Sequence, residues 1–193
     1  MQWRCLSEAE LSALYDTDLC RDFPAGELRP RAAALALMRR GVYHVWGIFD
    51  PAGGTPRLAA YLLMASPLAE GPLLLDYFAV LPAWRCRGLG AALLAELSRR
   101  EARSVVIESE LPETAPDPAL ARRRLAFYRR CGALDTPLWD RVYDGRYRVL
   151  VLPAPGQTDA VLDARTLAAM YRILLPGEEY VKFFEFGPAA PSV

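Results

Sequence analysis

Residues 73–97 read Leu73-Leu-Leu-Asp76-Tyr-Phe-Ala-Val80-Leu-Pro82-Ala-Trp-Arg85-Cys-Arg87-Gly88-Leu-Gly90-Ala-Ala-Leu-Leu-Ala-Glu-Leu97, an apolar strand that runs through an Arg/Gly turn into an amphipathic helix. Two glycines in the turn let successive backbone N–H groups converge without interference from a Cβ atom. The N-terminus of the helix adds partial positive charge at the same place. The stretch therefore predicts an anion-binding turn that a pyrophosphate would fit.

Two common phosphate-binding motifs do not describe this turn. It lacks the Gly-Lys-Ser/Thr ending of a Walker loop. It also lacks the third glycine of the dinucleotide fingerprint and the acidic residue that should follow about 20 positions later. A nucleotide binder built on this turn stays a weaker alternative, which predicts tighter binding of ATP or NAD than of coenzyme A. A further alternative is that the glycines only allow tight packing, although packing does not require the flanking Arg85 and Arg87.

The pattern Arg-x-x-Gly-x-Gly, after a strand that ends Phe-Ala-Val-x-Pro, resembles the coenzyme A signature of the Gcn5-related N-acetyltransferases, the GNAT family. The resemblance covers residues 1–152 and implies one α/β domain. Its sheet should be mixed, mostly antiparallel and twisted, with about seven strands, a splayed central parallel pair and flanking helices. Residues 153–193 would be a C-terminal extension packed on this domain, with a helix and an edge strand.

Composition limits the remaining classes of function. The 193 residues include 53% hydrophobic ones, which is ample for the core of one domain. Basic and acidic residues number 23 each, so no overall charge favours nucleic acid or a membrane surface. Four scattered cysteines and a single histidine predict neither a zinc site nor disulfides. We expect a cytoplasmic protein without a leader, a membrane span or a metal.

Local patterns predict the order of the elements. Strands are expected over residues 2–6, 42–49, 57–65, 73–80, 104–110, 146–152 and 180–186. Helices are expected over residues 7–19, 31–40, 88–100, 117–131 and 163–175, several of which begin at Ser or Asp caps and end at glycine. A strand, a crossover helix and a second strand between residues 73 and 110 imply a parallel pair.

The resemblance assigns the coenzyme site to the end of the central strand and to the turn. In that fold the pantetheine lies between the splayed strands and bonds to their backbone, and the N–H of Val80 would polarise the thioester carbonyl. The implied coenzyme-binding residues are Phe78, Ala79, Val80, Arg85, Cys86, Arg87, Gly88, Leu89, Gly90 and Ala91. The thiol of Cys86 is expected to react with alkylating agents and to be protected by bound coenzyme.

Acetyl transfer to an amine needs an acid for the leaving thiolate and a base for the ammonium proton. The segment Leu125-Ala-Phe-Tyr128-Arg-Arg-Cys-Gly132-Ala looks like the family's helix that carries the acid, which implies Tyr128 in this role. The alternative is that the ring of Tyr128 is only part of the core. Glu108 is the preferred base, with Glu110 and then Asp76 in reserve. These carboxylates could instead bind a cationic substrate or stay solvated.

The sequence departs from the family pattern at three positions. Ala121 stands where many relatives have an asparagine that bonds the pantetheine, and Ala133 replaces an aromatic residue. Cys86 stands where the turn usually has a glycine or a polar residue. The run Arg122-Arg-Arg124 would either reach the coenzyme phosphates or form a solvated helix face, and His44 is expected to be structural.

The sequence therefore predicts an acetyltransferase that moves an acetyl group from acetyl-CoA to a primary amine by direct attack in a ternary complex. Acidic residues near the expected cleft favour a small cationic acceptor (Glu70, Asp76, Glu108, Glu110, Glu113), and a peptide N-terminus stays open. A homodimer is compatible with this view. The alternative is a non-catalytic acyl-CoA-binding sensor or assembly module, consistent with Ala121.

Overall fold

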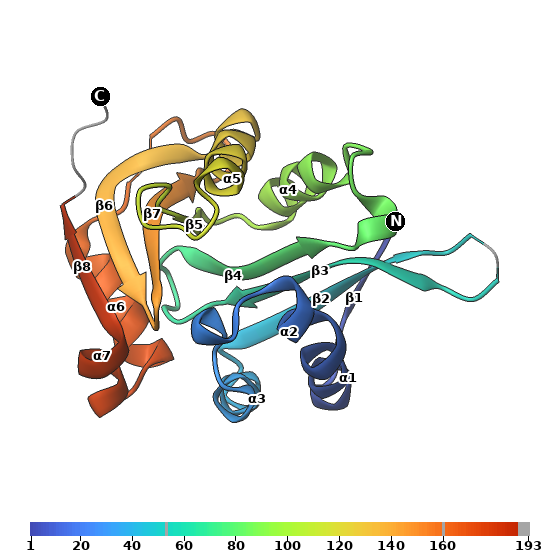
Figure 1. Cartoon of the computed structure of the whole chain (residues 1–193), viewed down its shortest axis with the longest axis horizontal. Helices are drawn as coiled ribbons and strands as arrows, with labels where there is room; N and C mark the ends of the chain where they lie inside the picture. Colours follow the sequence, from blue (N-terminus) through green and yellow to red (C-terminus); the bar gives the residue numbers. More distant parts are fainter. Residues whose placement is uncertain (53, 160, 189–193) are drawn as a thin grey trace.

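The fold is one twisted eight-stranded sheet with helices on both faces, seen in a computed structural model that describes residues 1–52, 54–159 and 161–188 (Figure 1). The strand order is β1-β2-β3-β4-β5-β7-β6-β8. The strands are β1 (Gln2–Cys5), β2 (Tyr43–Asp50), β3 (Arg57–Ala65), β4 (Leu73–Val80), β5 (Val105–Glu110), β6 (Leu134–Val142), β7 (Gly145–Leu152) and β8 (Phe184–Pro188). The α-helices are α1 (Glu8–Leu14), α2 (Cys20–Asp22), α3 (Arg31–Arg39), α4 (Leu89–Arg100), α5 (Pro118–Arg130), α6 (Ala164–Leu174) and α7 (Glu178–Phe183).

The central pair β4 and β5 is parallel, and every other neighbouring pair is antiparallel. Strand β4 pairs with β5 only over Leu73–Leu75 and Val105–Ile107. Beyond Leu75 and Ile107 the two strands separate, which confirms the predicted splay. The unpaired edges leave backbone groups of both strands free to bond to something else.

A β-bulge sits on β4 where the splay begins. Met64 pairs with Leu75 and Leu63 pairs with Tyr77, so Asp76 is the extra residue. A bulge re-aims the side chains on either side of it. It turns Asp76 and Tyr77 toward the same face of the sheet as α3.

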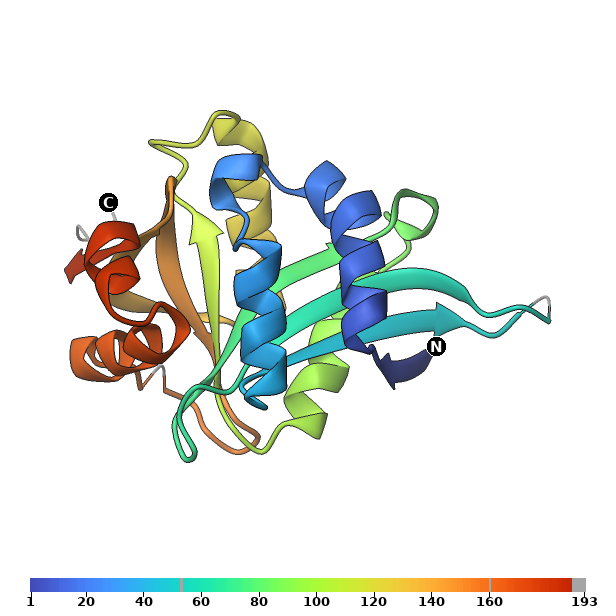
Figure 2. The ribbon, with the colours of Figure 1, turned by 90° about the horizontal axis from the view of Figure 1, so that it is seen from below.

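The two faces of the sheet carry separate apolar cores. Helices α1, α3 and α6 pack on one face over residues such as Val45, Leu74 and Val106. Helices α4 and α5 pack on the other over residues such as Leu62 and Ile107. Figure 2 shows α1 and α3 crossing the sheet, with α6 and α7 over its far end. Within the described ranges, no helix has the length and apolarity that crossing a membrane requires.

Capping residues set the helix ends as predicted. Ser7 and Glu10 form a capping box at α1, in which the Glu10 carboxylate accepts from the Ser7 N–H. Asp117 caps α5, where Pro118 occupies the first turn, and Asp163 caps α6. The expected helix over residues 7–19 differs in detail, because α1 passes into a π-helical turn over Tyr15–Leu19 before α2.

The prediction of about seven strands was one short. Strand β6 was missed because Pro137 and two aspartates interrupt its apolar alternation, and Pro137 lies in the irregular register between Asp135 and Trp139. The expected edge strand over residues 180–186 was also partly wrong. Its first part belongs to α7, and the strand β8 begins only at Phe184 and pairs with β6.

Candidate active site

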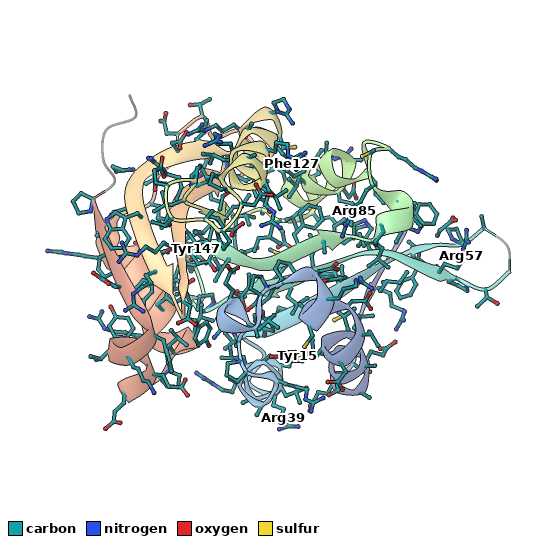
Figure 3. All side chains as sticks on the ribbon, in the orientation of Figure 1. Tyr15, Arg39, Arg57, Arg85, Phe127 and Tyr147 are labelled. Carbon is teal, nitrogen blue, oxygen red and sulfur yellow. The ribbon has the colours of Figure 1, made fainter. Side chains whose placement is uncertain are left out.

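A cavity of about 920 Å³ follows the splay between β4 and β5. Its walls come from the end of β4, the following turn, the start of α4, the unpaired part of β5, helix α5 and the loop before α3. Figure 3 labels three of its lining residues on three elements, Arg85 after β4, Phe127 on α5 and Tyr147 on β7. The cavity thus joins the glycine turn to the carboxylates of β5.

The glycine turn has the backbone that its sequence predicted. Gly88 has φ +73° and precedes the first residue of α4, and a Cβ atom there would have no neighbour within 4 Å. A Cβ at Gly90 would lie 3.2 Å from Phe127 Cζ and 3.7 Å from Val80 Cγ2. The glycines therefore keep the turn open toward the cavity and let α4 begin close to α5 and β4.

The last residues of β4 have backbone groups that point into the gap between β4 and β5. The Leu81 N–H donates to the Ala59 carbonyl on β3, so the alternation of the strand points the Val80 N–H away from β3, toward β5. The Val80 carbonyl accepts from Arg85 Nε at 2.7 Å. Val80 therefore offers its N–H to a ligand in the splay, while its carbonyl is already bonded.

The two arginines of the turn differ in their position relative to the cavity. Arg85 lines the cavity and is bound on its other side to Asp22, at 3.3 Å. Arg87 is not among the lining residues, and its guanidinium lies 5.8 Å from the ring centre of Trp84. Arg130, at the end of α5, lines the cavity instead and was not singled out from the sequence. Nine of the ten implied coenzyme-binding residues, all except Arg87, line the cavity.

Tyr128 lies on α5, half-buried, and lines the cavity. Its ring packs beside Phe127 at a centroid distance of 5.3 Å. Burial raises the pKa of the Tyr128 hydroxyl to about 12. The hydroxyl is thus protonated at neutral pH and can donate a proton to a group in the cavity.

Glu108 lies on β5 beyond the last pair with β4, and its side chain reaches the cavity. The hydroxyl of Tyr171 on α6 donates a hydrogen bond to Glu108 Oε1. Burial raises the pKa of the Glu108 carboxyl to about 7, against the opposing effect of that hydrogen bond. A carboxyl with this pKa exchanges protons readily at neutral pH, as a general base requires.

The two reserve carboxylates are held in ion pairs. Asp76 accepts from the buried Arg29 Nε at 3.1 Å and from the Tyr43 hydroxyl. Glu110 pairs with Arg124 of α5. Both line the cavity, as Glu108 does, whereas Glu70 and Glu113 are not among the lining residues.

Sequence reasoning missed Glu27 and Tyr147, which line the same cavity. Burial and the nearby Glu110 raise the pKa of the Glu27 carboxyl, and a hydrogen bond from Tyr147 opposes this. Glu27 ends a three-residue 3₁₀ helix before α3, which is too short for a periodic pattern that would mark a residue as inward-facing. Tyr147 could have been found from the alternation of β7.

Comparison with solved structures identifies the fold. An acetyltransferase described as a member of the GNAT family, from Bacteroides thetaiotaomicron, aligns with a TM-score of 0.62 and 22% identity over 86% of this chain and 90% of its own. The chain has the GNAT acetyltransferase fold. Neither a protein-family model nor a curated protein matches the sequence.

Two further GNAT-fold structures carry named activities. Spermidine N-acetyltransferase from Vibrio cholerae, in complex with CoA and spermine, aligns with a TM-score of 0.59 and 8% identity over 79% of this chain and 94% of its own. Ribosomal-protein-S18-alanine N-acetyltransferase from Escherichia coli aligns with a TM-score of 0.52 and 19% identity over 83% and 99% of the two chains. At these identities the likeness concerns the fold.

The structure shows what surrounds the residues at which this sequence departs from the GNAT family pattern. Ala121 is fully buried on α5 and offers no polar side chain to the cavity. All three arginines of the run Arg122–Arg124 are exposed, and Arg124 is bound to Glu110. In the regions that the structure covers, no group of three or more His, Cys, Asp or Glu residues is placed to hold a metal ion.

Cys86 of the GNAT turn is exposed, lines the cavity and has φ +60°. We expect iodoacetamide to label Cys86, and saturating acetyl-CoA to slow this labelling at least tenfold by covering the thiol. The measurement is peptide mass spectrometry over time. Cys5 and Cys20 are also exposed but lie outside the cavity lining, so their labelling rates should not change. Equal protection of all three thiols, or of none, would refute the prediction.

Proposed function

We propose that this protein is an N-acetyltransferase that transfers the acetyl group of acetyl-CoA to the primary amine of a small cationic molecule. The observation that carries the proposal is the continuity of one cavity from the glycine turn, past the Val80 N–H and Tyr128, to Glu108. Each group that the chemistry needs lies on this cavity. The named activities of the structural neighbours support the proposal.

The residues of the turn suit the coenzyme. The open backbone at Gly88 and the first N–H groups of α4 would bind its pyrophosphate, and Arg130 supplies positive charge on the same wall. The unpaired edges of β4 and β5 would bind the amide groups of the pantetheine, as a strand binds a neighbour. Acetyl-CoA supplies an activated thioester.

Three groups of the chain would then act on the reactants. Glu108 takes the proton of the acceptor ammonium, which frees the nitrogen lone pair for direct attack on the thioester carbon. The N–H of Val80 stabilises the negative charge that develops on the thioester oxygen. Tyr128 donates its proton to the leaving sulfur as the carbon–sulfur bond breaks. The products are the acetylated amine, free coenzyme A and one proton.

Charge on the acceptor side favours a cation. Asp76 and Glu110 are neutralised by Arg29 and Arg124. Glu27 and Glu108 have no such partner in the part of the chain that the structure covers. An ammonium would supply the missing positive charge for these two, whereas an anionic acceptor would meet repulsion.

The first test is calorimetric titration of acetyl-CoA into the wild type, a Gly88→Glu variant and a Gly156→Glu control. Gly88→Glu places a carboxylate beside the pyrophosphate, and we expect affinity to fall at least a hundredfold. Gly156 has φ +84° and open space for a Cβ atom, like Gly88, but lies outside the cavity lining. Its replacement has the same backbone cost without the effect on binding.

Different outcomes separate the alternatives. Binding by the wild type and the control, followed by release of thiol with a panel of polyamines and amino-acid amides, would support the proposal. Binding without release of thiol for any amine would favour the non-catalytic acyl-CoA sensor. Tighter binding of ATP or NAD than of acetyl-CoA would instead indicate a nucleotide-binding protein.

A further inference from the structure

Two buried side chains lie next to the carboxylate of Glu108, on the side away from the cavity, and are not part of the cavity lining. Tyr171, on α6, is fully buried and donates its hydroxyl hydrogen to Glu108 Oε1. Asp140, on β6, is also fully buried. The three residues come from separate elements that meet at one point behind the cavity.

The strand register explains why Asp140 faces Glu108. Glu108 pairs with Val149 of β7, and Asp140 pairs with Tyr147 two residues earlier on the same strand. Residues two apart on a strand point to the same face. The carboxyl groups of Glu108 and Asp140 therefore face each other across β7, beneath α6, close enough for each to shift the pKa of the other.

Both carboxylate oxygens of Asp140 are buried, and no protein donor within the described ranges bonds to them. Two ionised carboxylates have no hydrogen to share, so their contact is repulsive. One proton on either of them turns the contact into a hydrogen bond. A buried pair of this kind therefore retains a proton.

Other charged groups near the pair do not replace that proton. Asp76 and Arg29, on the β4 side, neutralise each other, and Arg29 also donates to the Leu174 carbonyl. Tyr147 lies on β7 and is held neutral, because burial and the nearby acids raise the pKa of its hydroxyl. Burial and the neighbouring Glu108 also raise the pKa of Asp140 well above its usual range. Glu108 already accepts a hydrogen bond from Tyr171, whereas Asp140 accepts none from the described residues, so the proton belongs on Asp140.

We infer that Asp140 and Tyr171 are positioning residues, which hold the catalytic base Glu108 by two hydrogen bonds, one from the protonated Asp140 carboxyl and one from the Tyr171 hydroxyl. The inference rests on the proposed function of Glu108. In each turnover the ammonium proton moves to Glu108 and then to solvent. The Asp140 proton stays in place, so the carboxyl pair binds one more proton during the reaction and loses it afterwards.

The inference gives α6 a part in the site. Tyr171 lies 63 residues from Glu108 in the sequence, in the segment after residue 152 that the resemblance did not cover. Its ring stacks on Phe184 of β8 at a centroid distance of 4.0 Å. The C-terminal segment thus contributes a hydrogen bond to the base in addition to its part in the core.

The test is the pH dependence of kcat/KM for acetyl transfer. The wild type should lose activity as the pH falls through about 7, where Glu108 becomes protonated. Tyr171→Phe removes a donor to ionised Glu108. The acidic limb of the pH profile, which is the pH range over which this activity is lost, should therefore move to higher pH. Asp140→Asn keeps a neutral donor to Glu108, so its limb should stay close to that of the wild type, whereas Asp140→Leu removes the donor, so the limb should move to higher pH. Shifts of about one pH unit correspond to about tenfold changes in relative activity below the limb.

The matched control is Thr136→Val. Thr136 is also buried on β6, and its hydroxyl donates to the Val149 carbonyl at 2.8 Å without touching Glu108. This variant should be less stable, but its kcat/KM should fall over the same pH range as that of the wild type. A limb that stays in place in both Asp140→Leu and Tyr171→Phe, while the folded state is retained, would overturn the inference.

A measurement without turnover separates this inference from the proposed function. At about pH 8.5, above the Glu108 pKa of about 7, infrared spectra of the intact protein should show a protonated carboxyl that Asp140→Asn lacks and Thr136→Val keeps. Absence of that band in the wild type overturns the inference whatever the activity. Its presence without any acetyl transfer supports the carboxyl pair and contradicts the proposed reaction instead.

Discussion

Tyr128→Phe is expected to lower kcat for acetyl transfer by about a hundredfold or more, while the affinity for acetyl-CoA stays close to that of the wild type. The phenyl ring retains the packing beside Phe127, so the helix and the cavity wall persist. The variant lacks the hydroxyl, whose pKa of about 12 keeps it protonated and ready to donate. Continuous detection of released coenzyme A thiol measures the rate, and calorimetry measures the affinity.

Tyr15→Phe is the matched control for this experiment. The Tyr15 hydroxyl donates to the Arg29 carbonyl at 2.9 Å and lies outside the cavity lining. We expect a small loss of stability and an unchanged kcat. If Tyr128→Phe turned over at the wild-type rate, the proton would reach the sulfur from water or another group. A weakened affinity with unchanged kcat would assign Tyr128 to coenzyme binding.

Arg29→Met is expected to lower the free energy of unfolding by about 3–5 kcal/mol, because it leaves the carboxylate of Asp76 buried without its cation. Arg29 is 1% exposed and donates from Nε to Asp76 at 3.1 Å and from Nη1 to the Leu174 carbonyl at 3.0 Å. The pair joins β4 to the end of α6. Urea denaturation followed by circular dichroism measures the change.

Arg31→Met provides the comparison at the surface. Arg31 pairs with Asp16 at 2.7 Å, but both side chains are largely exposed. Its replacement should cost about 0–1 kcal/mol, because water screens such a pair. Equal losses for Arg29→Met and Arg31→Met would contradict the assigned role of burial. The double variant Arg29→Met/Asp76→Leu should recover part of the loss, since no unpaired charge then remains.

The sequence alone determined the local parts of the site. Glycines at 88 and 90, placed between an apolar strand and an amphipathic helix, specify a backbone that few other residues allow. The side chains of the caps Ser7, Asp117 and Asp163 each accept from an N–H three positions later, so their effect can be predicted from neighbouring residues. The parallel pair followed from the order of a strand, a crossover helix and a second strand.

Only the tertiary structure decided how distant side chains share their charges. Local periodicity gave no sign that Arg29 would meet Asp76, 47 residues further on, or that Arg87 would lie over Trp84 and outside the cavity. Strand β6 is stabilised by pairing with both β7 and β8, which outweighs the poor strand propensity of Pro137 and its aspartates. Once β6 was missed, Asp140 could not be placed on a buried face. Hydrogen bonds along one segment depend on near neighbours, whereas the environment of a buried carboxyl such as Glu108 depends on every element that packs against it.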